Sequence, residues 1–275
     1  MNEFIATKTK ALVVLSGGQD SATCVAWAKQ RYDEVHAITF DYGQRHSIEL
    51  ESAKKVAAVL EVDSHEIVTI PSDVLKGTSP LVNADAEVDE FQSESDIPSG
   101  VAKTFVPVRN QFFLTIAANH AFVKGISVLV TGVCETDYSG YPDCRREFID
   151  SLENTLNLGT FTGESWLEGN LKIETPLMYL TKAQSVDLAI EEGGYPVLAY
   201  THTAYDGSYP PKGTDAASIL RARGFLEAGV PDPLILRAYK SGALASLPDT
   251  PNYAEQVVKS VLAEIAQVYG DNWYA

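Results

Sequence analysis

A short apolar stretch that runs directly into two glycines constrains the fold of this chain more than any other feature. Residues 11–15 are apolar, residues 16–21 read Ser-Gly-Gly-Gln-Asp-Ser, and helix-forming residues continue to about Arg31. A short run that is apolar throughout and bounded by glycine is typical of a strand buried on both faces of a parallel sheet. The sequence therefore predicts a strand, a glycine-rich turn and a helix in this order.

Further strand and helix patterns alternate along the chain. Strands are predicted at 34–40, 64–70 and 127–133, and helices at 49–60, 110–123, 148–158 and 181–192, the last with Thr181 as N-cap. Strands that alternate with helices imply right-handed crossovers. We therefore expect an α/β fold, with a Rossmann-like parallel sheet and helices on both faces.

The texture of the chain changes near residue 195. Residues 1–195 are predicted to form the nucleotide-binding and substrate domain. Residues 196–275 are rich in Pro, Gly and Tyr at first and then helical at 216–227 and 253–268. We expect this second part to form a C-terminal helical appendage. The polar, acidic segment 79–103 is predicted to be a long loop or lid.

Composition excludes several classes of function. Acidic residues outnumber basic ones 37 to 21, and the formal charge is -16. This charge repels phosphate backbones and anionic lipids, so bulk nucleic-acid binding and membrane binding are not expected. The chain has no run of roughly 18 apolar residues. Cys24, Cys134 and Cys144 show neither zinc-pair nor disulfide spacing. We expect a soluble, cytoplasmic protein.

The glycine turn has the properties of a phosphate-binding loop. Two glycines between a strand and a helix let backbone amides converge on an anion at the helix N-terminus. Ser16 and Ser21 add hydroxyl donors, and Asp20 is suited either to cap the helix or to hold Mg²⁺. The pattern GxxxxGK[ST] is absent, so the loop has no lysine for the terminal phosphates. An ordinary strand–helix turn is the alternative interpretation, because Ser, Gly and Asp are common in turns.

This string resembles the SGGxDS loop of the PP-loop ATP pyrophosphatases. The resemblance implies a fold of the adenine nucleotide alpha hydrolase type. It also implies that ATP is cleaved between its α and β phosphates and that AMP is transferred to a substrate oxygen.

A second informative string, residues 134–145, follows the strand predicted at 127–133. It reads Cys-Glu-Thr-Asp-Tyr-Ser-Gly-Tyr-Pro-Asp-Cys-Arg. A carboxylate such as Asp137 or Glu135 can accept the two adjacent donors of a guanine-like base. Tyr138 or Tyr141 can stack on the ring, and Arg145 can face an acidic group. A solvated surface loop is the alternative interpretation.

Three strings together resemble the 7-cyano-7-deazaguanine synthase family of queuosine biosynthesis. They are residues 134–145, Phe-Asp-Tyr-Gly-Gln-Arg-His at 40–46, and Thr-Phe-Val-Pro-Val-Arg-Asn at 104–110. The match runs in register from about Leu12 to Arg221. The resemblance implies a homodimeric, ATP-dependent ligase that forms C–N bonds and releases AMP and pyrophosphate. The implied substrates are 7-carboxy-7-deazaguanine and ammonia, and the implied product is the nitrile 7-cyano-7-deazaguanine.

The resemblance also implies the site residues, which fall into three groups. The catalytic group is Asp20, Ser21 and Lys182, with Lys182 as a polyphosphate cation rather than a solvated helix lysine. The ATP group is Leu15, Ser16, Gly17, Gly18, Gln19, Asp20, Ser21, Asp41, Tyr42 and Gln44. The substrate group is Arg109, Asn110, Glu135, Asp137, Tyr138, Ser139, Gly140, Tyr141, Asp143 and Arg145. The implied cofactors are ATP and Mg²⁺.

The chain departs from the family pattern at three places, one of which is a tail from about Leu234 to Ala275 that is longer than in the compact family pattern. The four cysteines that bind a structural zinc in the family correspond here to Ala204, Lys212, Asp215 and Ser218. Of these four residues only Asp215 could coordinate zinc, with His202 nearby in sequence, so no structural zinc is expected. Val108 stands where the family usually has glycine, and valine has no easy access to positive φ.

Three alternatives remain open at the level of sequence. A diverged ligase would join the activated carboxylate to another amine, such as the N-terminus of a partner protein. A catalytically inactive regulatory subunit would not need the intact glycine loop. RNA binding is opposed by the charge.

Overall fold

A five-stranded parallel sheet forms the centre of the computed structural model, which describes residues 8–43, 48–83, 85–136, 140–160 and 170–274. The strands are β1 (Lys10–Val14), β2 (Glu34–Asp41), β3 (Ser64–Thr69), β4 (Val128–Val130) and β5 (Lys172–Glu174). Their order is β3-β2-β1-β4-β5, and every pairing is parallel. The order reverses between β1 and β4. Ligands of open α/β sheets bind at this switch point, beyond the carboxyl ends of the strands.

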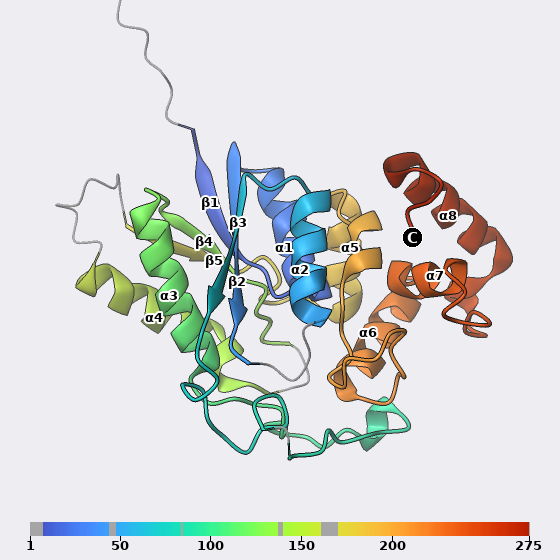
Figure 1. The fold of residues 1–275 in the computed structure, drawn as a ribbon, viewed down its shortest axis with the longest axis horizontal. Helices are drawn as coiled ribbons and strands as arrows, with labels where there is room; N and C mark the ends of the chain where they lie inside the picture. Colours follow the sequence, from blue (N-terminus) through green and yellow to red (C-terminus); the bar gives the residue numbers. More distant parts are fainter. Residues whose placement is uncertain (1–7, 44–47, 84, 137–139, 161–169, 275) are drawn as a thin grey trace, which may run out of the picture.

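Helices cover both faces of the sheet (Figure 1). Helices α1 (Gln19–Lys29), α2 (Ile48–Val59) and α5 (Lys182–Glu191) lie on one face, and α3 (Arg109–Val123) and α4 (Arg146–Gly159) lie on the other. Each face of the sheet has its own apolar cluster, and the residues of β1 alternate between them. Val13 belongs to the cluster on the side of α1, and Leu12 belongs to the cluster on the side of α3. This arrangement confirms the predicted Rossmann-like fold.

Strand β5 was not predicted, and β4 is shorter than the pattern at 127–133 indicates. β5 has three residues, and only the middle one, Ile173, is buried. A strand this short gives too few alternating positions for a sequence pattern. It pairs with β4 and completes that edge of the sheet.

The C-terminal part of the chain adds three helices to the face that carries α5. They are α6 (Ala216–Glu227), α7 (Pro233–Lys240) and α8 (Glu255–Tyr269). Phe225, Leu236 and Trp273 belong to the same apolar cluster as Val13 of the central strand. The domain boundary expected at residue 195 stays a prediction, and one core extends across it.

Helix α7 was missed because it is short, although it carries a clear start signal. Asp232 is its N-cap and accepts a hydrogen bond from the Leu234 amide at 2.9 Å, and Pro233 occupies the first turn. Proline is well suited to the first helical position because the missing N–H has no partner there. None of the helices in the described ranges combines the length and the apolar character needed to cross a bilayer.

The acidic segment 79–103 is largely irregular, as expected, with one short 3-10 turn at Glu94–Asp96. It lies against the C-terminal helices. The Phe91 amide donates to the Thr214 carbonyl at 2.7 Å, and Glu94 pairs with Arg223 of α6. Two segments that are more than a hundred residues apart in sequence are thereby joined.

Candidate active site

A cavity of ≈ 360 Å³ opens at the switch point of the sheet. Its walls come from the loop after β1, the end of β2, the starts of α2, α3 and α5, the loop after β4, and residues 202–221. The cavity therefore brings together the glycine loop and described residues of the strings at 40–46, 104–110 and 134–145. It also includes a C-terminal segment that was not assigned to the site.

The glycine loop is shaped by one close backbone contact. Gly17 has φ of 90°, and a Cβ atom there would lie 2.3 Å from the Glu49 carbonyl oxygen and 2.8 Å from the Ala53 nitrogen. Only glycine permits both the left-handed conformation and this approach. Gly17 therefore seats helix α2 against the loop. It does not line the cavity.

Two serines hold the loop in shape. The Ser21 hydroxyl donates to the Gly18 carbonyl at 3.0 Å and accepts from the Ser16 amide at 3.2 Å. Gly18 is the N-cap of α1, and no side chain makes a capping hydrogen bond there. The first amides of α1 therefore lack a side-chain acceptor, which is the usual arrangement of an anion site at a helix N-terminus.

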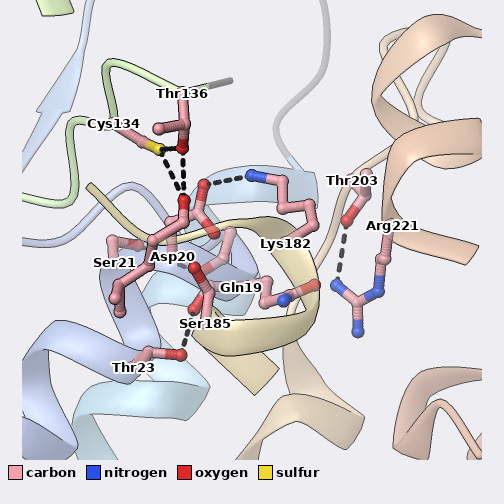
Figure 2. A network of polar contacts seen from close by, with 12 residues as sticks. Gln19, Asp20, Ser21, Thr23, Cys134, Thr136, Lys182, Ser185, Thr203 and Arg221 are labelled. Carbon is pink, nitrogen blue, oxygen red and sulfur yellow. Dashed lines mark hydrogen bonds and ion pairs between the residues drawn. The ribbon is translucent and has the colours of Figure 1, made fainter. Parts of the chain in front are cut away.

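Asp20 does not cap helix α1, although capping was one of its two expected roles. Its Oδ2 accepts a hydrogen bond from Lys182 Nζ at 2.7 Å, in an ion pair between side chains that are 27% and 22% exposed. Figure 2 shows the lysine reaching across from α5 to the first turn of α1. Lys182 also lines the cavity. The chain therefore supplies from α5 the cation that its loop lacks.

Three sequence features position Lys182. Thr181 is the N-cap of α5, as predicted, and exchanges hydrogen bonds with Gln184 at 3.2 and 2.9 Å. Gly224 of α6 packs against the start of α5, where a Cβ atom would lie 2.8 Å from Lys182 Cβ. Gly132, after β4, makes room for Asp20 in the same way, since a Cβ atom there would lie 3.1 Å from the Asp20 carbonyl carbon.

Polar atoms in the first turn of α1 have no partner within the described ranges. They are Asp20 Oδ1 and both side-chain amide atoms of Gln19, all of them buried. Buried polar atoms are nearly always hydrogen-bonded, to ligand or solvent if not to protein. A carboxylate oxygen is a suitable Mg²⁺ ligand. The residues present therefore fit a nucleotide with its metal ion.

Arg109, at the start of α3, forms the second half of the cavity. Burial opposes its charge, but Tyr42, Tyr141, Tyr205 and Asp143 around it raise its pKa. It therefore carries a fixed positive charge. Aromatic rings extend this wall, since Phe113 stacks on Phe40 with centroids 4.4 Å apart and lies 5.1 Å from the Tyr42 ring.

Asn110 lines the cavity next to Arg109 and is held by hydrogen bonds to Asp143, which does not line it. The backbone N–H of Asn110 donates to Asp143 Oδ2 at 3.3 Å. The side-chain Nδ2 of Asn110 donates to the Asp143 carbonyl at 3.3 Å. Burial raises the pKa of Asp143. Tyr141 is held by a 2.5 Å hydrogen bond with the Thr104 hydroxyl.

The structure brings most of the expected site residues to one cavity. The predicted residues that line it are Leu15, Ser16, Gly18, Gln19, Asp20, Ser21, Tyr42, Arg109, Asn110, Tyr141 and Lys182. Those in the described ranges that are not among its lining residues are Gly17, Asp41, Glu135, Gly140, Asp143 and Arg145. Gln44, Asp137, Tyr138 and Ser139 lie outside the described residues.

Two of the non-lining residues serve helix α4 instead. Glu135 is exposed, and its Oε2 accepts a hydrogen bond from the Arg146 amide at 3.2 Å. Arg145 is exposed and is the N-cap of α4. Gly140, at φ of 60°, packs against the Gly100 carbonyl, where a Cβ atom would lie 2.7 Å away. Substrate contacts by these three residues stay a prediction.

Several lining residues were not assigned from the sequence. They include Glu49, Cys134, His202, Thr203, Tyr205 and Arg221. His202 is fixed beside the glycine loop, since its amide donates to the Gly17 carbonyl at 2.9 Å. No local pattern marks His202, Thr203, Tyr205 and Arg221, because the packing of the C-terminal segment brings them to the loop.

The positions of the family's zinc ligands are occupied by other interactions. Asp215 is the N-cap of α6 and accepts from the Ser218 amide at 3.0 Å and from its hydroxyl at 2.6 Å. Lys212 pairs with Asp206 at 2.7 Å, and Ala204 is buried. Within the described ranges, no group of three His, Cys, Asp or Glu residues is placed to hold a metal.

The parallel sheet, the glycine loop at its switch point and the lysine supplied by α5 define an ATP-using enzyme of the PP-loop class. The family model described as "Queuosine biosynthesis protein QueC" matches residues 10–229. The chain belongs to this family. Helices α7 and α8 lie beyond the matched range.

Curated relatives agree with this assignment. A 7-cyano-7-deazaguanine synthase of Gloeobacter violaceus is 51% identical over 228 residues, which cover 82% of this chain and 95% of the relative. One from Laribacter hongkongensis is 48% identical over 227 residues, covering 82% and 94%. A solved 4-thiouridine synthetase–RNA complex with bound ATP is more distant, with a TM-score of 0.44, 16% identity, and coverage of 96% of this chain and 51% of that one.

Proposed function

We propose that this chain converts 7-carboxy-7-deazaguanine into 7-cyano-7-deazaguanine with ATP and ammonia. The observation that carries this proposal is the ion pair of Asp20 and Lys182 at the N-terminus of α1, where no side chain makes a capping hydrogen bond. Two further observations support it. The chain is 51% and 48% identical to two 7-cyano-7-deazaguanine synthases, and a cavity with aromatic residues in its wall lies beside the loop.

The proposed reaction has four steps. A carboxylate oxygen attacks the α phosphorus of ATP, so that a P–O bond forms and pyrophosphate leaves. Ammonia attacks the resulting acyl carbon, AMP leaves as an anion, and nitrogen loses a proton. The amide oxygen then attacks the α phosphorus of a second ATP, and a second pyrophosphate leaves. Loss of this AMP and of two protons from nitrogen leaves the nitrile.

The N-terminus of α1 and Lys182 of α5 are proposed to stabilise the negative charge that develops on the phosphates in these steps. Amides of α1 and the Lys182 ammonium face the triphosphate, where charge develops on the pyrophosphate that leaves. Mg²⁺, when bound, supplies further charge neutralisation, with Asp20 Oδ1 as its carboxylate ligand.

The acid substrate is assigned to the other half of the cavity. Arg109 is a cation on this wall, and Phe113 and Tyr42 offer ring faces for a purine-like base. Arg221 also lines the cavity, but Asp232, Thr201 and Thr203 already engage its guanidinium. Arg109 is therefore the better candidate for the substrate carboxylate.

Three finer assignments belong to the same proposal. They are a homodimeric assembly, a cytoplasmic location, and ammonia rather than a protein N-terminus as the acceptor. Sedimentation analysis addresses the first assignment, and product analysis with the competing amines addresses the third.

Mass spectrometry of products from ATP, the carboxylated base and ammonia tests the function. We expect the free nitrile, with AMP and pyrophosphate. A product limited to ADP and phosphate would contradict the mechanism. A base conjugated to a polypeptide would favour the diverged ligase.

A further inference from the structure

We infer that a second, smaller cavity beside Lys182 is the route by which the amine reaches the activated acid, an inference that rests on the proposed function. This cavity has a volume of ≈ 160 Å³. Lys182 and Cys134 line both cavities, so the smaller one abuts the catalytic cavity at the Asp20–Lys182 pair. In Figure 2, Cys134 and Lys182 lie on either side of Asp20.

The walls of this amine cavity suit a small neutral molecule. Leu180 and Leu220 line it, together with Cys134, Thr136 and the charged residues Glu94, Lys182, Arg223 and Glu227. The volume accommodates ammonia, which is close in size to water at ~30 Å³ per molecule. The amine must reach the acyl carbon as neutral NH3, because the ammonium ion has no lone pair to donate. The Lys182 ammonium lines this cavity and repels an ammonium ion, so the neutral form passes it at lower cost.

The rim of the amine cavity is acidic. Glu94, from the acidic segment, and Glu227 both pair with Arg223 of α6, which lies 2.7 Å from Glu227 Oε1. The three side chains are 28%, 44% and 49% exposed, so they face solvent. Two carboxylates against one guanidinium leave a net negative charge at the rim. This charge concentrates ammonium ions near the entrance.

A separate entrance has a chemical advantage. ATP and the acid occupy the larger cavity when the acyl adenylate forms, so an amine that used the same mouth would have to pass both. Through the amine cavity, ammonia approaches from the side of Lys182. Its nitrogen forms a bond to the acyl carbon, the bond from that carbon to the AMP oxygen breaks, and a proton leaves the nitrogen.

The first test narrows the passage. In Leu220→Trp the larger side chain fills the amine cavity, whereas in the control Leu226→Trp it lies on the solvent side of the same helix, at a residue that is 42% exposed. We expect the KM for ammonium to rise about tenfold or more in Leu220→Trp alone. Acid-dependent exchange of pyrophosphate into ATP, which needs no amine, should stay at the parental rate.

An unchanged KM for ammonium in Leu220→Trp would overturn the inference, as would an equal loss of both activities. Absence of acid-dependent pyrophosphate exchange in the parent protein would instead refute the proposed function. The two failures are therefore distinguishable.

A second variant keeps the test available if the tryptophan variant does not fold. Arg223→Ala removes the rim cation and leaves two carboxylates, so we expect a lower KM for ammonium at low ionic strength and no difference at high salt. The control is Arg31→Ala, which removes an arginine paired with Glu192 on the opposite end of α5. Equal salt responses in the two variants would overturn the inference.

Discussion

Lys182 Nζ lies 2.7 Å from Asp20 Oδ2, and this ion pair joins the first turns of two helices that are 162 residues apart in sequence. It places a cation beside a glycine loop that contains none. The amides of α1 and the Lys182 ammonium thereby face one cavity. The pair is the element on which the proposed adenylation depends.

Replacement of Lys182 by alanine should slow adenylation strongly without unfolding the protein. Loss of one preorganised charge or donor costs about 2.7–4 kcal/mol, a factor of ~10²–10³ in rate. Acid-dependent pyrophosphate exchange measures the effect. Lys54→Ala is the control, because Lys54 pairs with Glu51 on the exposed face of α2, away from the cavity. A rate within twofold of the parent would remove Lys182 from the site.

Gly224→Ala should impair catalysis although residue 224 does not line the cavity. Its Cβ would meet Lys182 Cβ at 2.8 Å, so the start of α5 must shift. Overpacking of this kind costs ~1–3 kcal/mol in stability, and a misplaced catalytic group can cost ~10²-fold in rate. Gly159→Ala is the control, because a Cβ atom there would meet no described residue outside its own helix turn within 4 Å. Equal melting temperatures and exchange rates in both variants would contradict this account.

Val108→Gly should stabilise the protein. Val108 has φ of 60° at the N-cap of α3, where the Cβ atom is strained by ~1–2 kcal/mol. Glycine removes this strain but adds freedom to the unfolded chain, so we expect a net gain of ~0.5–1 kcal/mol. Urea denaturation measures it. Val123→Gly, at the exposed end of the same helix, should destabilise, and a loss in both variants would show that Val108 is unstrained.

The purified protein should contain no stoichiometric zinc, and a chelator should leave its melting temperature unchanged. Asp215 caps α6 through Ser218, so Asp215→Ala should cost ~0.5–2 kcal/mol. Elemental analysis and thermal unfolding with and without chelator test both statements. One zinc per chain would show that the module retains a metal site, and a stable Asp215→Ala variant would show that the cap contributes little.

Glu49→Gln should change how stability depends on pH. Burial raises the pKa of Glu49, against the opposing effect of Arg109. The native state then keeps a proton that the unfolded chain has released, so the unfolding free energy falls as pH rises from the usual glutamate pKa of ~4.3 to the folded value. Glu49→Gln should remove this fall. Glu51→Gln, an exposed neighbour, should keep it, and identical pH profiles for all three proteins would contradict the assignment.

Local patterns in the sequence were sufficient for most of the fold. The run at 11–15, the glycine turn and the capping signals at Thr181 report interactions between near neighbours, which do not depend on the rest of the chain. Helix α6 was predicted with its observed bounds for the same reason. Strand β5 and helix α7 were missed because short elements carry few periodic positions.

The sequence by itself determined the family, the fold class and the identity of the loop, because those signals lie in contiguous strings. Only the tertiary structure decided that Lys182 meets Asp20, that Gly224 and Gly132 make room for this pair, and that Glu135 serves helix α4. It also placed Tyr205 in the catalytic cavity and Arg223 at the rim of the amine cavity. These contacts join residues far apart in the chain, and their formation depends on the packing of whole helices, which no local pattern encodes.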